Sequence, residues 1–137
     1  MSHFVECQTE FRDPLALVAA LVECGFEANQ IEVHQDAVPL YGYRGDVRPQ
    51  KAHVVIRRQH VGQAANDVAW ELQTDGTYRA WISEYDRRHR FNESMCNRVK
   101  QLYAYQVITR QQRARGRTVS RERLPNGELE VVIGGYR

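Results

Sequence analysis

Apolar and polar side chains alternate at the start of the chain, between residues 3 and 11. The odd-numbered positions include Val5, Cys7 and Phe11, whereas the even-numbered positions are mostly polar. A period of two is typical of a strand with one buried face. We therefore expect a half-buried strand whose odd-numbered side chains point inward.

A helix is predicted to follow directly, over residues 14–24. Asp13 supplies a side-chain acceptor for the helix N-terminus, and Pro14 takes the first helical position, where proline is well tolerated. Gly25 can adopt the left-handed conformation that ends a helix, and Phe26 can fold back over the last turn. The apolar stripe that would face the core comprises Leu17, Val18, Leu21, Val22 and Cys24.

The middle of the chain contains short apolar runs separated by polar residues. Residues 31–34 predict a short strand, and residues 53–58 predict a second one. The segment between them, residues 36–50, is rich in Pro, Gly, Asp and aromatic residues. This composition predicts an irregular connection.

A hairpin is expected next. Residues 67–72 alternate cleanly, with Trp70 on the apolar face. The Asp-Gly pair at residues 75–76 is typical of a tight turn, because it tolerates positive φ. Residues 78–85 then return as the partner strand, and Trp81 leaves their inward face open between two choices.

The last part of the chain predicts a long helix and a hairpin. After a charged connector at residues 86–91, the helix covers residues 92–115 and ends at Gly116. Its buried face comprises Met95, Val99, Leu102, Tyr103 and Val107. The hairpin pairs residues 118–124, which have an edge-strand composition, with residues 128–133. The side chains of this hairpin that are predicted to point inward are Leu129, Val131 and Ile133.

This order of elements predicts an α+β fold. We expect a single two-layer domain over residues 1–137, with a mostly antiparallel sheet and two helices packed on one face. The length fits one domain, and 42% hydrophobic with 26% charged residues is ordinary for a globular protein.

The chain lacks the features of membrane and secreted proteins. Its longest purely apolar run, residues 15–22, is far shorter than the ~20 residues that cross a bilayer. The N-terminus has no basic region followed by an apolar stretch, so we expect a cytoplasmic protein without membrane contact. Cys7, Cys24 and Cys96 lie far apart, which favours reduced thiols.

No motif predicts a catalytic residue, a metal site or a cofactor. The histidines never occur at the three- or four-residue spacing that places two ligands on one helix face. A catalytic set such as Cys7, His3 and Asp13 could assemble, but core packing explains Cys7 more simply. Residues 42–45 do not resemble a phosphate-binding loop.

Two segments instead suggest binding. Tyr43 and Arg44 lie between Gly42 and Gly45, where they could stack on a base or hold an acidic group. The alternative is a bulged turn whose tyrosines cover an edge of the core.

The second segment is basic, because residues 98–137 carry nine bases and three acids, whereas residues 1–50 carry eight acids and three bases. Its arginines could neutralise several phosphates, in binding that salt would weaken, although a pI near 8.5 is modest for a nucleic-acid-binding domain. A solvated helix end and hairpin explain the same charges. These candidate nucleic-acid-binding residues are Arg110, Arg113, Arg115, Arg117, Arg121 and Arg123.

Several segments together resemble a known family over nearly the whole chain. They are residues 1–4, 9–25, 42–45, 52–57, 76–78, 102–105, 116 and 126–127. The chain resembles the conserved hypothetical reading-frame family of algal plastids, cyanobacteria and other bacteria, a domain of unknown function. The resemblance implies no established activity, cofactor or catalytic residue. Genes of this family often lie beside a gene for an AAA-type ATPase, which implies an accessory or adaptor role. The chain departs from the family pattern by extra residues at 27–39 and 86–91.

The leading hypothesis is a non-enzymatic binding or adaptor protein with a protein partner, such as an AAA-type ATPase. Its expected partner-binding residues are Arg12, Tyr43 and Arg44, because loops on a rigid scaffold often carry binding. The first alternative is a nucleic-acid-binding protein that uses the C-terminal arginines. The second is a small-molecule enzyme of unknown class.

Overall fold

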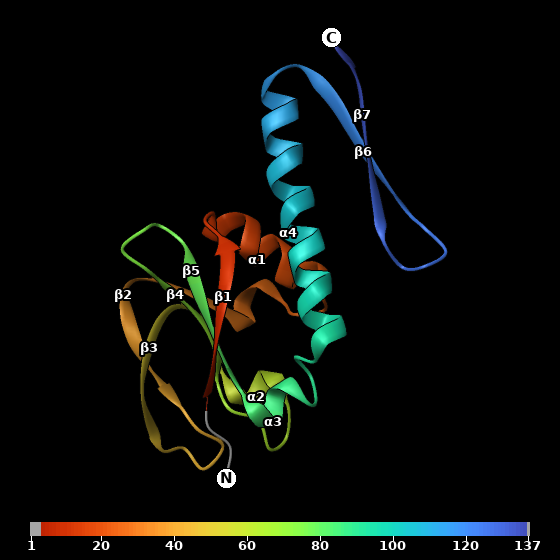
Figure 1. Cartoon of the computed structure of the whole chain (residues 1–137). Coiled ribbons are helices and arrows are strands. Elements are labelled where there is room, and N and C mark those ends of the chain that lie inside the picture. Colours follow the sequence, from red (N-terminus) through yellow and green to blue (C-terminus); the bar gives the residue numbers. More distant parts are fainter. Residues whose placement is uncertain (1–3, 137) are drawn as a thin grey trace.

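A five-stranded sheet forms the centre of the molecule (Figure 1). The computed structural model describes residues 4–136, and it describes side chains for residues 11–135. The strands, in spatial order, are β1 (Phe4–Phe11), β5 (Tyr78–Ser83), β4 (Val68–Leu72), β3 (Val47–Ile56) and β2 (Ile31–Tyr41). Every neighbouring pair is antiparallel, and the predicted α+β class is confirmed. The prediction that Val5 and Cys7 point inward lies outside the described side chains, whereas Phe11 is buried.

Two helices cover one face of this sheet (Figure 1). Helix α1 (Pro14–Glu23) begins as predicted, since Asp13 Oδ1 accepts hydrogen bonds from two backbone N–H groups of its first turn. Helix α4 (Glu93–Ala114) begins at Asn92, whose side chain accepts from the N–H of Met95. Glycines with positive φ follow both helices, Gly25 at +110° and Gly116 at +76°. None of the helices in the described part of the chain is both long and apolar enough to cross a bilayer.

The main core lies between the helices and the sheet. Leu17 and Leu21 from α1 meet Leu102 from α4 over Trp70 of β4. Strand β5 directs Tyr78, Ala80 and Ile82 into this core, which settles the orientation that the sequence left open. A smaller cluster on the other sheet face contains Leu40, Ala52, Val55 and Ala69, with Trp81 packed against it.

The largest departure from the sequence prediction concerns residues 36–50. They form most of one long hairpin, β2–β3, rather than an irregular connection. Pro39 and Pro49 are tolerated because β2 is an edge strand and β3 pairs with β4 only over Val54–Ile56. An irregularity in the pairing register between Val33 and Val38 allows strand β2 to bend there.

This hairpin is strongly curled. Ile31 pairs with Ile56, beside Val68, while Tyr41 forms backbone and side-chain hydrogen bonds with Asp67. A straight strand would separate Ile31 from Tyr41 by roughly 30 Å, so both ends of β2 can reach the same corner only if it curves. The curve encloses the smaller apolar cluster.

Two short helices lie at this corner. Helix α2 (Arg58–Val61) follows β3, so the strand predicted to reach Arg58 ends at Ile56. Helix α3 (Glu84–Arg87) begins after Ser83, so the predicted strand end and charged connector are wrong there. Both ends of the predicted connector are buried, since Asp86 and Phe91 are each 1% exposed.

The C-terminal hairpin forms a separate two-stranded sheet beside α4 rather than an edge of the main sheet (Figure 1). Its strands are β6 (Arg117–Arg123) and β7 (Leu129–Tyr136). Leu129 packs against the main core as predicted, and Val131 is half-buried. Ile133 is 45% exposed, so its predicted burial is wrong, because α4 alone cannot cover the whole face of this hairpin.

Candidate functional site

The turn of the curled hairpin, Gly42–Asp46, presents two of the sequence-predicted binding residues. Gly42 N donates to Asp46 O and Gly45 N donates to Gly42 O, each at 2.8 Å. Gly45 has a φ of +80°, and a Cβ on Gly42 would lie only 2.6 Å from the Asp46 carboxylate. Arg44 is exposed with its guanidinium 5.2 Å from the centre of the half-buried Tyr43 ring. The glycines thus permit a tight turn that displays a cation beside an aromatic ring.

This turn is anchored from outside the hairpin. The backbone N–H of Tyr43 donates to Asn66 Oδ1 at 2.9 Å, and Arg58 Nη1 donates to the Tyr43 carbonyl at 3.1 Å. Asn66 is 3% exposed, and its amide nitrogen donates to Ser83 Oγ at 2.8 Å. The position of Tyr43 is therefore set by residues that precede β4 and α3.

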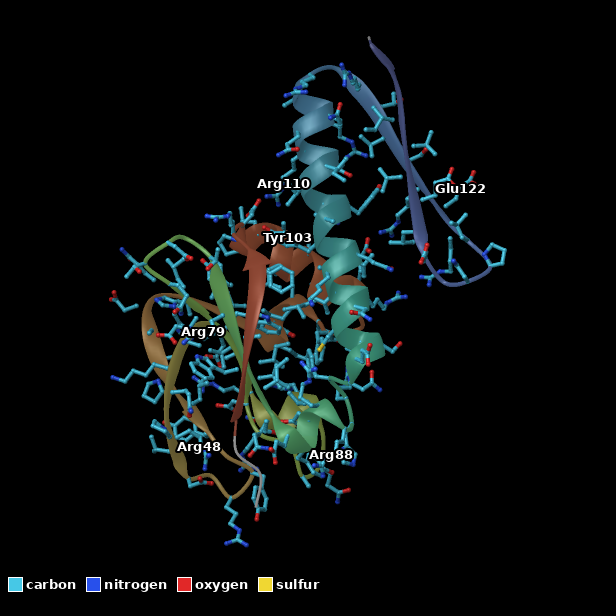
Figure 2. The ribbon with its side chains drawn as sticks, viewed as in Figure 1. Arg48, Arg79, Arg88, Tyr103, Arg110 and Glu122 are labelled. Carbon is cyan, nitrogen blue, oxygen red and sulfur yellow. The ribbon has the colours of Figure 1, made fainter. Side chains whose placement is uncertain are left out.

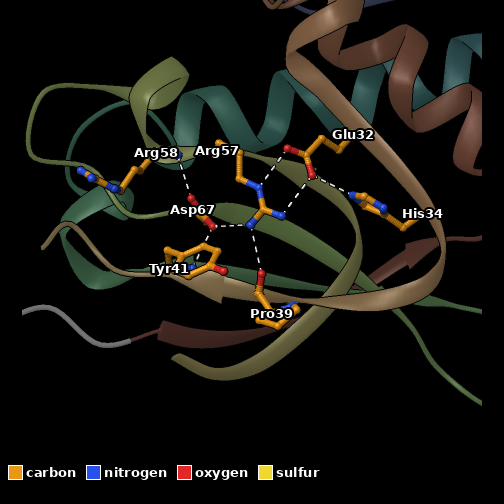
Figure 3. Close-up of polar contacts among 7 residues, drawn as sticks. All are labelled: Glu32, His34, Pro39, Tyr41, Arg57, Arg58 and Asp67. Atoms are coloured by element: carbon orange, nitrogen blue, oxygen red, sulfur yellow. Dashed lines mark hydrogen bonds and ion pairs between the residues drawn. The ribbon is translucent and has the colours of Figure 1, made fainter. Parts of the chain in front are cut away.

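Asp67 is the second anchor. Its buried carboxylate accepts hydrogen bonds from the backbone of Tyr41, the backbone of Arg58 and Arg57 Nη1, each at 2.8 Å (Figure 3). The Asp67 N–H also donates to the Tyr41 carbonyl. One carboxylate thereby joins the end of β2 to the end of β3.

Arg57, at the centre of Figure 3, adds to the contact between β2 and β3. Its guanidinium holds Glu32 through Nε at 2.9 Å and Nη2 at 3.1 Å, and it donates to the Pro39 carbonyl at 3.0 Å. Burial works against the charges here, but these bonds outweigh it, so the pKa of Glu32 is lowered and the pKa of Arg57 is raised. His34 adds a 2.7 Å contact to Glu32. We name Arg57, Arg58, Asn66 and Asp67 the clamp.

A buried acid lies behind the clamp. Asp86 Oδ2 accepts from Ser83 Oγ at 2.7 Å and from the Asn66 N–H at 3.1 Å. Oδ1 of the same carboxyl has no hydrogen-bond partner among the described atoms. Burial raises the pKa of Asp86, and the hydrogen bonds from Ser83 and Asn66 oppose this change only in part.

Arg12 does not join Tyr43 and Arg44. It lies at the end of β1, where its N–H donates to Tyr103 Oη at 2.8 Å and its Nη1 donates to the Asp75 carbonyl at 3.0 Å. Tyr103 belongs to α4 and is labelled in Figure 2. Asp75 follows β4, whereas the clamp precedes that strand. The strand therefore separates Arg12 from the turn.

The C-terminal arginines are also not one free patch. Arg110, labelled in Figure 2, bonds Asp13 at 2.6 Å. Arg121 bonds Glu23 at 2.7 and 2.9 Å, and Arg117 donates to Gln112 at 2.8 Å. The remaining three are exposed and have no acidic partner among the described residues: Arg113, Arg115 and Arg123.

The groups at the turn can recognise a partner by charge and by aromatic contact. Arg44 offers a guanidinium that suits a carboxylate, and Tyr43 offers one ring edge. Among the described side chains, no three of the types His, Cys, Asp and Glu lie close enough together to hold a metal ion.

Sequence reasoning missed the clamp. Asn66 was expected in a loop, Asp67 on the polar face of a strand and Asp86 in a charged connector. All three are buried, and their hydrogen-bond partners include residues 17 to 26 positions away, which no local pattern reveals. The one local signal is the placement of two hydrogen-bonding residues directly before the apolar strand β4.

Comparison with protein families gives a match over residues 21–132, which includes the turn, the clamp and most of the C-terminal hairpin. Comparison with curated proteins and with solved structures gives no match. The family match covers more than half of the chain and agrees with the resemblance to a domain of unknown function. The chain belongs to the family described as protein of unknown function DUF1257.

Proposed function

We propose that this chain is a non-enzymatic binding or adaptor protein that holds a protein partner at the turn Gly42–Asp46. An AAA-type ATPase is the partner class to test first, because the family resemblance associates such a gene with this family. The cytoplasm is the proposed location.

One observation carries the proposal: buried groups from other elements fix a turn whose tip is exposed. Asn66 and Asp67 hold the backbone of Tyr43 and Tyr41, yet Arg44 projects into solvent. A turn that only reverses the chain needs no such anchoring. A pre-ordered loop loses little conformational entropy on binding, so it can use its few contacts efficiently.

The charge of the turn indicates the partner surface. Asp46 is already paired with Arg48 at 3.3 Å, so Arg44 supplies the net positive charge. We therefore expect Arg44 to face a carboxylate of the partner, with the Tyr43 ring packed beside it.

The test is quantitative capture of an AAA-type ATPase from native host cells by tagged protein. Arg44→Ala is expected to reduce the captured ATPase about fivefold or more, a loss of ~1 kcal/mol in binding free energy. Lys51→Ala is the matched control, because Lys51 is an exposed cation on the same hairpin. It is expected to capture as much ATPase as the wild type.

Thermal unfolding separates binding from folding. Arg44→Ala should melt within a degree or two of the wild type, since its side chain is exposed. Undiminished capture by Arg44→Ala, or loss of capture together with loss of folding, would contradict the proposal.

Nucleic-acid binding is the second candidate, and the observation that favours it is the exposure of Arg113, Arg115 and Arg123. Binding to a generic duplex and a generic single strand should then weaken steeply as salt rises. Absent or salt-independent binding would end this candidate.

A further inference from the structure

The β6–β7 hairpin lies beside helix α4, far from the turn Gly42–Asp46 (Figure 1). Residues of α4 and of this hairpin line a groove between them. Two adjoining hollows, of about 260 and 360 Å³, form this groove. The two hollows have four lining residues in common: Arg98, Leu102, Arg123 and Leu129. We call the surface that these four residues line the C-terminal groove.

The two walls of the C-terminal groove carry the same chemistry. Arg98 and Leu102 are four residues apart on α4, so they share one helix face. Arg123 and Leu129 are direct partners across β6 and β7, so they share one face of the hairpin. Each wall therefore contributes one guanidinium and one leucine.

The charge of the groove is not balanced by its own acids. Arg123 is exposed without an acidic partner among the described residues, and Arg98 is half-buried beside the Cys24 thiol. Glu23 also lines the groove, but its carboxylate is already bonded to Arg121 through two hydrogen bonds. Glu128 is the remaining acidic residue of the described lining, against the two arginines Arg98 and Arg123. The groove thus has an excess of positive charge.

We propose that the C-terminal groove binds a short acidic peptide segment of a protein partner. A carboxylate of the segment bonds Arg98 and Arg123, because guanidinium groups form strong charge-assisted hydrogen bonds with carboxylates. An apolar side chain of the segment packs on Leu129, which is half-buried and lies against the core residue Leu102. This surface lies beyond the turn Gly42–Asp46 and does not depend on it.

The same arginines could meet phosphates, but the lining favours a peptide. Single-stranded nucleic acids need aromatic rings on which bases stack, whereas the described groove lining has leucines in that place. A peptide can instead place a single carboxylate between the arginines.

The experiment is a fluorescence anisotropy titration of the full chain at low salt. The probe is a fluorescein-labelled peptide of sequence Ser-Glu-Glu-Leu-Glu-Glu-Ser. Its two matched peptides replace every Glu by Gln, or the Leu by Ser. We expect saturable binding of the probe, and binding at least severalfold weaker for each matched peptide.

Variants assign the binding to the groove. The double variant Arg98→Gln with Arg123→Gln should bind the probe at least tenfold more weakly than the wild type. Arg113→Gln removes an exposed arginine of α4 that does not line the groove, and it should bind within about twofold of the wild type. Circular dichroism of each variant checks that the fold is intact, and Arg123→Gln alone serves if the double variant is unfolded.

Several outcomes would overturn this inference. They are absent binding of the probe, equal weakening by Arg113→Gln, and tighter binding of a labelled oligothymidylate than of the probe. Arg44→Ala separates the two proposals, because it should bind the probe like the wild type even if ATPase capture fails.

Discussion

Two hairpins of this protein, β2–β3 and β6–β7, each have a glycine with positive φ in the turn, yet they are held in different ways. Gly45 in the first and Gly127 in the second both have positive φ, at +80° and +87°. The first hairpin is fixed by Asp67, whose side chain is 1% exposed. The second is fixed by the Arg121–Glu23 pair, whose side chains are 33% and 30% exposed.

The difference shows that a turn signal does not determine how firmly a hairpin is held. A buried carboxylate that loses its partners leaves several polar groups without hydrogen bonds, at a high energetic cost. An ion pair near water can exchange its partners for solvent, so its loss costs little. Among the described side chains of the β6–β7 strands none is fully buried, whereas the curl of β2–β3 buries Leu40 completely.

Asp67→Ala is the change with the largest expected effect. It removes three hydrogen bonds and leaves Arg57 with Glu32 as its one acidic partner among the described residues, so the free energy of unfolding should fall by about 3 kcal/mol. Urea denaturation measures this change. Glu130→Ala, an exposed acid of the second hairpin, is the control and should lie within ~0.5 kcal/mol of the wild type. A loss below 1 kcal/mol for Asp67→Ala would mean that the clamp does not fix the first hairpin.

Asp86→Asn tests the buried acid behind the clamp. This change should raise the free energy of unfolding at neutral pH, by less than Asp67→Ala lowers it. The pKa of Asp86 is raised in the folded state, so between its unfolded and folded pKa the folded chain keeps a proton that the unfolded chain has lost. Stability from this group is therefore present below the unfolded pKa and falls as pH rises through the folded pKa.

Asparagine cannot ionise, so the variant should match the wild type near pH 3 and exceed its stability by about 1 kcal/mol at pH 7. The amide oxygen can still accept from Ser83 and Asn66 in place of Oδ2. Denaturation curves at both pH values decide the matter. If the variant matched the wild type near pH 3 but was less stable at pH 7, the charged form of Asp86 would stabilise the fold, contrary to this prediction.

Arg121→Ala has the smallest expected effect. It removes the pair with Glu23 and the contact with the Tyr105 ring, 4.6 Å from the guanidinium to the ring centre. Because both partners are about one-third exposed, global stability should fall by less than ~1 kcal/mol. Amide hydrogen exchange should nevertheless become faster in β6 and β7 and stay unchanged in β2 and β3. Faster exchange in both hairpins would show that the two regions are not held independently.

Local signals in the sequence determined the helices and the tight turns. Asp13 and Gly25 bound α1, Asn92 and Gly116 bound α4, and these contacts join residues only a few positions apart. Such signals act through backbone geometry and short hydrogen bonds, so the surrounding fold changes them little. The display of Arg44 between two glycines was predictable for the same reason.

Only the tertiary structure decided that residues 36–50 form a curled hairpin and that Asn66, Asp67 and Asp86 are buried. Strand pairing and the burial of polar groups depend on partners far along the chain, as between Tyr41 and Asp67, 26 positions apart. Composition suggests a loop at such a segment because prolines and charged residues seldom pair well by themselves. The β2–β3 hairpin is stable here because Arg57 and Asp67 form hydrogen bonds with the backbone of Pro39 and Tyr41 from the other side of the curl.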